Sequence, residues 1–83
     1  MKATVEISLY PLKKNYKKTI LSFIEQLNKN KKIKVETNGL STQLFGDYEE
    51  IMKTLTKESI KVFEKDKAVF IMKIAQGELR YKK

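Results

Sequence analysis

Hydrophobic and polar residues alternate strictly at the start of the chain. From residue 3 to residue 9 the odd positions are apolar and the even positions are polar, and Pro11 follows. This period of two is typical of a β-strand with one buried face, and a proline commonly ends such a run. The pattern predicts a strand over residues 3–9 whose odd-numbered side chains face a core.

Apolar residues then recur at helical spacing after Asn15. The stripe along one helix face consists of Tyr16, Ile20, Phe23, Ile24 and Leu27. Asn15 belongs to the residue types that cap helix N-termini with their side chains. The spacing predicts a helix over residues 16–27 with a lysine-rich polar face.

The middle of the chain has the pattern of a β-hairpin. Residues 33–37 alternate again, and residues 40–45 can return beside them. Between the two runs, Asn38-Gly39 favours a type I′ turn, because that turn requires positive φ at both central residues. We therefore predict two antiparallel strands joined at this dipeptide.

A second helix is predicted after Gly46. Asp47 and Glu50 resemble a capping box in which Asp replaces Ser or Thr. The stripe that follows runs for about four turns and contains Tyr48, Ile51, Met52, Leu55, Ser59, Val62 and Phe63. We expect the helix to end at residues 65–67.

The last apolar run covers residues 68–75 and is broken only by Lys73. A run without alternation predicts a strand buried on both faces. Residues 79–83 form a basic tail, which we expect to be partly frayed.

The element order β-α-β-β-α-β predicts an α+β, ferredoxin-like fold, with a four-stranded antiparallel sheet and two helices on one of its faces. Residues 1–83 are expected to form a single domain. Because the last strand offers apolar side chains to both sides, the uncovered face would carry an apolar strip. We predict that a second copy covers it, giving a dimer or tetramer packed sheet to sheet or through edge strands.

Composition argues against catalysis. The chain contains neither Cys nor His, so the usual general base and the usual soft metal ligands are absent. We predict no enzymatic activity, no metal site and no cofactor. No run of ten apolar residues occurs, so neither a signal peptide nor a membrane span is expected, and we place the protein in the cytoplasm without a membrane partner.

The net charge of +8 would ordinarily indicate an anionic partner. All basic residues except Arg80 are lysines, whereas readers of phosphates and bases favour the bidentate arginine. The lysine clusters at 13–18 and 29–34 are typical of solvated faces, and the strands lack the stacked aromatic residues of an RNA-recognition motif. Nucleic acid is therefore not the expected partner.

Small hydrogen-bonding side chains are densest over residues 37–43. The segment is either a hairpin turn with polar shoulders or a surface that hydrogen-bonds the edge of a neutral heteroaromatic ligand.

Two motifs together resemble the YkoF-like family of thiamine-binding proteins. The run Ile7–Leu12 contains Ser-Leu-Tyr-Pro, and the run Val35–Asp47 contains Thr-Asn-Gly-Leu-Ser-Thr-Gln-Leu-Phe-Gly. The resemblance covers nearly the whole chain and implies a ferredoxin-like domain. It also implies binding of thiamine or its hydroxymethylpyrimidine moiety without known catalysis. The chain resembles a single-domain member, in which pairing of subunits would replace a tandem repeat.

Carried over to this sequence, the resemblance points to Ser8, Tyr10, Thr37, Asn38, Ser41 and Thr42 as ligand contacts. Gln43 joins them because an aminopyrimidine needs a donor and an acceptor side by side, and Tyr10 or Phe45 would supply an aromatic wall. A thiazolium cation gains from a basic protein only if Glu6 or Glu36 lies close to it. For either carboxylate a lysine partner is the alternative role.

We therefore predict a non-enzymatic, homo-oligomeric binding protein for thiamine or a hydroxymethylpyrimidine-type precursor. Two alternatives stay open. One is an oligomeric regulatory or interaction module with no small ligand, and the other is a weak nucleic-acid binder whose affinity would fall steeply with salt.

Overall fold

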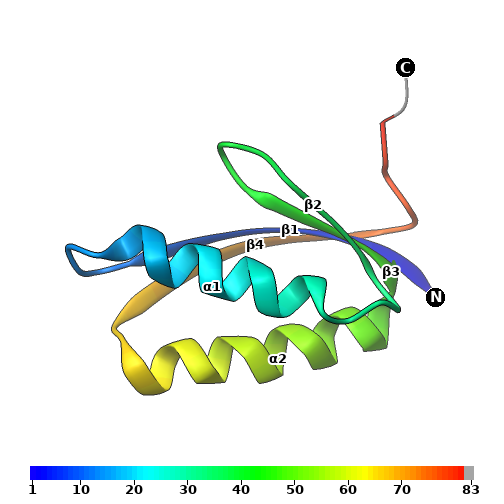
Figure 1. Ribbon diagram of the computed structural model, residues 1–83. Helices are drawn as coiled ribbons and strands as arrows, with labels where there is room; N and C mark the ends of the chain where they lie inside the picture. The colour runs from blue at the N-terminus through cyan, green and yellow to red at the C-terminus, as the bar shows by residue number, and fades with distance from the viewer. Residues whose placement is uncertain (82–83) are drawn as a thin grey trace.

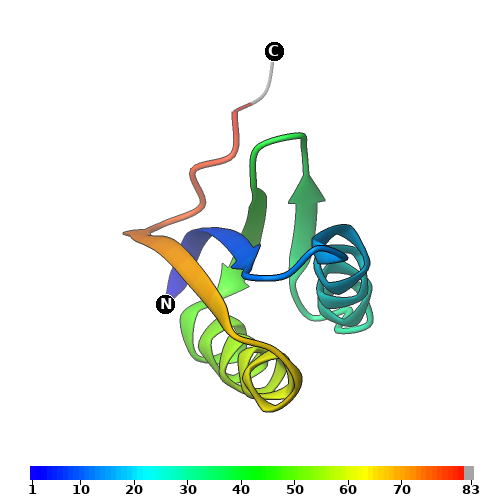
Figure 2. The same cartoon turned by 90° about the vertical axis from the view of Figure 1, so that its left-hand side faces the viewer.

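A computed structural model of the chain describes residues 1–81. The elements in chain order (Figure 1) are β1 (Lys2–Pro11), α1 (Tyr16–Asn28), β2 (Lys34–Thr37), β3 (Thr42–Asp47), α2 (Tyr48–Lys65) and β4 (Ala68–Gln76). The strands form one antiparallel sheet in the order β2-β3-β1-β4, and both helices cover the same face (Figure 2). The predicted ferredoxin-like α+β fold is confirmed. Within residues 1–81, no helix is long and apolar enough to cross a membrane.

The core lies between the sheet and the helices, around the odd-numbered side chains of β1. These side chains are buried as the alternation predicts, and they pack with Phe23, Leu27, Ile33, Leu44, Ile51, Leu55 and Val62. The α2 stripe is rotated slightly from the predicted one. Thr54 and Glu58 are buried, whereas Phe63 is 54% exposed and packs edge-on against Phe70 of β4.

Both helices begin where they are predicted to begin, but neither predicted side-chain cap forms. Asn15 and Asp47 precede α1 and α2 without a capping hydrogen bond from their side chains. Asp47 Oδ1 instead accepts a hydrogen bond from the Met1 ammonium at 3.3 Å, which lowers the pKa of its carboxyl. Glu50 accepts a hydrogen bond from Asn30 at 2.8 Å. The two carboxylates therefore connect the start of α2 to neighbouring segments.

The hairpin between β2 and β3 is confirmed, but the predicted type I′ turn is wrong. Residues 38–41 connect the strands, and Gly39 does not have a positive φ. The Asn38 side chain closes the loop, since its Oδ1 accepts hydrogen bonds from the amides of Leu40 at 2.8 Å and Ser41 at 3.1 Å. The loop is thus closed by a side-chain acceptor, where a two-residue backbone turn was expected to join the strands.

The expectation that the last strand is buried on both faces is wrong for the chain by itself. β4 is an outer strand with β1 as its neighbour. Its side chains Ile71 and Ile74 are 58% and 49% exposed. The apolar run that is typical of a central strand here forms an open sheet edge.

The chain after β4 crosses the open face of the sheet. The Thr4 hydroxyl donates to the carbonyl of Gly77 and accepts from the amide of Leu79, both at 2.8 Å. Arg80 then binds Glu36 of β2 through Nε and Nη2, each at 2.7 Å. Residues 79 and 80 of the tail that is expected to be partly frayed are thus hydrogen-bonded to the sheet, and residues 82–83 lie outside the described residues.

This crossing covers Phe45. Phe45 of β3 pairs with Thr4 on one side and Lys34 on the other, so its side chain shares the open face with theirs. It is nevertheless only 2% exposed. The tail residues that connect β1 to β2 pass over this position and exclude water from it.

The loop geometry leads to a prediction about glycine substitutions. Gly39→Ala is expected to leave the free energy of unfolding unchanged or to raise it by up to about 1 kcal/mol, because its φ is negative and an added Cβ would meet no atom within 4 Å. Gly77→Ala, the matched control, should lower it by about 1–2 kcal/mol, because Gly77 has a φ of +89°. Urea unfolding measures both, and a loss at Gly39 comparable to that at Gly77 would contradict the loop described here.

Candidate functional site

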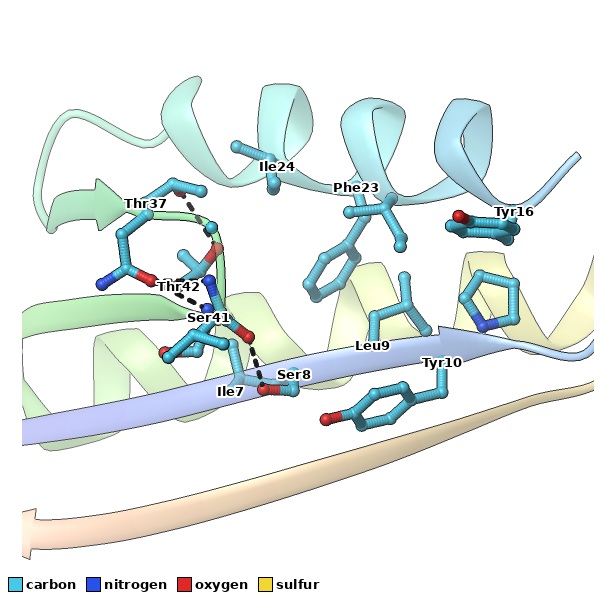
Figure 3. Close-up of a pocket in the computed structure, with 15 residues that line it drawn as sticks. Ile7, Ser8, Leu9, Tyr10, Tyr16, Phe23, Ile24, Thr37, Ser41 and Thr42 are labelled. Atoms are coloured by element: carbon cyan, nitrogen blue, oxygen red, sulfur yellow. Dashed lines mark hydrogen bonds between the residues drawn. The ribbon is translucent and has the colours of Figure 1, made fainter.

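A pocket of about 300 Å³ lies between the first half of α1, the end of β1 and the β2–β3 loop (Figure 3). It forms beside the part of β1 that has no β3 neighbour, because β1 pairs with β3 only as far as Ile7, opposite Thr42, the first residue of β3, but continues beside β4 to Pro11. Of the residues predicted to contact a ligand, those that line the pocket are Ser8, Tyr10, Thr37, Asn38, Ser41 and Thr42. Two motifs far apart in the sequence thus meet at one place.

The apolar wall of the pocket comes from α1. Its residues are Tyr16, Ile20, Phe23 and Ile24, and Figure 3 shows Tyr16 and Phe23 pointing from the helix towards Leu9 of β1. The sequence pattern assigns all of them to the helix stripe and none to a site. The sequence signal that could have indicated a site is Tyr16. It is an aromatic residue at the first position of the helix, where the apolar stripe begins.

Most of the polar side chains at the pocket are already engaged with the protein. The hydroxyls of Thr37 and Thr42 share a hydrogen bond of 3.0 Å, and Ser8 Oγ donates to the carbonyl of Leu40 at 3.4 Å. These contacts fix the loop against β1. Within residues 1–81 the Tyr10 hydroxyl has no hydrogen bond, and Figure 3 shows it on the opposite side of β1 from Leu9.

Gln43 is the predicted contact that does not line the pocket. It pairs with Glu6 and Glu36 of the neighbouring strands, and its side chain therefore shares the open face of the sheet with theirs. Phe45, considered as an aromatic wall, lies on that face too. The aromatic residues at the pocket are instead Tyr10, Tyr16 and Phe23.

The two strand carboxylates have different partners. Glu6 accepts a hydrogen bond from Ser41 Oγ at 3.0 Å and lies 3.7 Å from Lys73 Nζ, so the expected lysine partner is present. Glu36 is bound by Arg80 rather than by a lysine. Glu6 is therefore the carboxylate connected to the pocket, through Ser41. No three acidic side chains among residues 1–81 form a group that could hold a metal ion.

Lysines gather around a second hollow, of about 490 Å³, between α1 and α2. Lys13 binds Asp66 at 2.9 Å, and Lys61 binds the buried Glu58 at 3.4 Å. The only aromatic residue that lines this hollow within the described part of the chain is the buried Phe23. The hollow thus lacks the exposed stacking platforms that single-stranded nucleic acids require.

Comparison with known proteins gives one family. The model of the YKOF-related Family matches residues 2–78. A search of curated proteins finds no match.

Solved structures similar to this one extend the comparison. A hypothetical protein of Methanocaldococcus jannaschii is 32% identical, with a TM-score of 0.79 over 96% of this chain and 84% of that chain. A protein of Streptococcus pneumoniae is 22% identical, with a TM-score of 0.85 over 95% and 90%. A Thermotoga maritima protein proposed to act in thiamine biosynthesis or salvage is 22% identical, with a TM-score of 0.82 over 93% and 85%. The likenesses at 22% identity show the fold alone.

The loop that roofs the pocket can be tested through Asn38. Asn38→Ala removes the acceptor of two amide hydrogen bonds and is expected to lower the free energy of unfolding by about 1 kcal/mol. Asn38→Asp keeps an acceptor oxygen in the same place and should change it by less than about 0.5 kcal/mol. Urea unfolding of the two variants decides, since equal losses would mean that the side chain does not close the loop.

Proposed function

Since the chain belongs to the YKOF-related family, we propose that it is a non-enzymatic binding protein for thiamine or a hydroxymethylpyrimidine-type precursor and that it works as a homo-oligomer. The observation that carries the proposal is the meeting of the two motifs at one pocket. Its volume of about 300 Å³ is at the lower end of the range of about 300–1,000 Å³ for small-molecule sites. This size favours the pyrimidine half of thiamine as the part that enters.

The lining supports an aromatic ligand with a polar edge. Tyr16 and Phe23 supply flat apolar surface on the α1 side, where a ring gains from burial and stacking. Glu6, joined to Ser41 of the pocket by a hydrogen bond of 3.0 Å, puts a negative charge beside the loop. A thiazolium cation would thus have a favourable neighbour in a protein whose net charge is +8. The role proposed for the Thermotoga maritima neighbour agrees with this ligand class.

Self-association is supported by the free edge of β4. On either side of β4, the carbonyl of Lys67 accepts a hydrogen bond from the amide of Leu12, the residue after β1, and the amide of Gly77 donates to the carbonyl of Lys2. The even-numbered residues of β4 therefore direct their N–H and C=O groups away from β1. The edge carries the exposed side chains of Val69, Ile71, Met72 and Ile74. Lys73 is its single charged residue, which is little protection against pairing.

A second copy of the chain suits this edge better than an unrelated partner. An antiparallel strand pair is self-complementary about a two-fold axis, so one β4 can pair with another without a new surface. The opposite edge of the sheet, β2, is only four residues long and carries Lys34 and Glu36, a short charged edge that resists pairing. Tyr10, half-exposed on the open face beside Val69, would then lie near the partner subunit.

The ligand proposal predicts a thermal shift. Thiamine, its phosphates or hydroxymethylpyrimidine at about 100 times the Kd should stabilise the fold by about 2.7 kcal/mol and raise Tm by several degrees. Ser41→Ala, in the pocket, should reduce the shift, whereas Gln43→Ala, outside it, should preserve it. If none of these compounds at millimolar concentration moves Tm, the ligand proposal is wrong.

The assembly proposal predicts a solution mass that is a multiple of the chain mass. Light scattering should show a dimer or tetramer, and Ile71→Lys should shift it to the monomer by placing a charge at the pairing edge. Ile60→Lys is the matched control, because Ile60 on α2 is 50% exposed and Ile71 is 58% exposed. A monomeric parent protein, or equal effects of the two variants, would contradict the proposed edge.

A further inference from the structure

The backbone of β1 has an unused hydrogen-bonding position at Leu9. The amide of Leu12 donates to the carbonyl of Lys67 at 2.9 Å, and the carbonyl of Lys2 accepts from the amide of Gly77 at 2.8 Å. Both contacts point from β1 towards the β4 side. Because the register between them has no interruption and the direction alternates along a strand, every even-numbered residue of β1 bonds to β4.

The odd-numbered residues of β1 therefore point to the β3 side. A hydrogen bond at the start of the chain supports this orientation. The carbonyl of Met1 accepts from the amide of Tyr48, the residue after β3, at 2.8 Å. The pairs continue along β3 to Ile7, opposite Thr42. Leu9 is the next odd residue, and it has no β3 residue opposite it because β3 begins only at Thr42.

Leu40 stands where the partner of Leu9 would be, but the ladder is broken there. Within residues 1–81, no backbone hydrogen bond joins Leu9 to Leu40. The Leu40 carbonyl accepts the Ser8 hydroxyl instead, and the Leu40 amide donates to Asn38. The loop thus satisfies its own groups and leaves the N–H and C=O of Leu9 directed into the pocket that both residues line.

We propose that the N–H and C=O of Leu9 form the hydrogen-bonding subsite of this pocket and that its ligand is a planar heterocycle with an adjacent donor and acceptor on one edge. An extended residue presents its two groups side by side on one side of the strand, which complements an amidine-like or lactam-like edge. The Ser8, Thr37 and Thr42 side chains hold the loop, and the backbone supplies the recognition.

The geometry fits a ring better than an added peptide strand. Strand addition uses several successive rungs, but beyond Leu9 the next odd residue is Pro11, which has a carbonyl and no N–H. Tyr16 and Phe23 from α1 also form one wall of the pocket. A flat ring can bond to the single free rung while its faces contact these side chains, whereas a second peptide chain would lack the successive rungs it needs.

Amide hydrogen exchange followed by NMR tests this subsite, with Val5 as the matched control. Val5 lies on the same side of the same strand but pairs with Leu44. In the free protein the Leu9 amide should exchange at least 100-fold faster than that of Val5. Saturation with hydroxymethylpyrimidine should slow Leu9 at least 10-fold and leave Val5 unchanged. The analogue without the 4-amino group should bind at least 10-fold more weakly.

The inference rests on the proposed function, and the outcomes separate the two. Binding of hydroxymethylpyrimidine without protection of Leu9 would overturn the subsite and leave the function standing. If thiamine and hydroxymethylpyrimidine do not bind, the function fails, and 2-aminopyridine and 2-pyridone then serve as probes of the same edge chemistry. Protection of Leu9 by either would support the subsite, and no protection by any of these compounds would overturn it. A Leu9 amide as slow as that of Val5 in the free protein would also overturn it.

Discussion

The backbone ladder of β1 is the interaction on which the rest of the structure depends. β1 is ten residues long and has β4 beside it for nearly its whole length, whereas its neighbour β3 is six residues long. The strand is therefore hydrogen-bonded on both sides over its first part and on one side beyond Ile7. Because a backbone amide without a partner is costly when buried, the unpaired end of β1 must be roofed, solvated or occupied.

The pocket is the consequence of that mismatch. The β2–β3 loop folds over the place of the missing rung, and Asn38 holds it there through two amide hydrogen bonds. α1 supplies the apolar wall because its stripe extends to Tyr16, beyond the level at which β3 begins at Thr42. The pocket thus arises from strand lengths and loop closure, with side-chain hydroxyls that position the loop.

The two faces of the sheet are covered by different segments, and its β4 edge is exposed. The helices cover one face, and the tail that ends in the Arg80–Glu36 ion pair covers Phe45 on the other. The exposed β4 edge stays available for a second copy of the chain. The positive charge is spread over loops and helix faces, where Lys13 and Lys61 bind carboxylates. The residues that line the pocket within the described part of the chain include no lysine or arginine.

The sequence by itself determined the element order, because alternation in residues 3–9 and the stripes of the two helices reflect local periodicity and burial. It also selected the residues of the two motifs that meet at the pocket, through their family resemblance. It did not determine the Asn38 loop, since Asn-Gly is compatible with more than one turn, or the exposure of β4, since apolar residues are found in buried strands and in edges alike. Only the tertiary structure decided that the tail covers Phe45, that Gln43 lies outside the pocket and that Leu9 has no β3 partner. Each of these depends on which strands lie side by side and where one of them ends, and no local pattern contains that information.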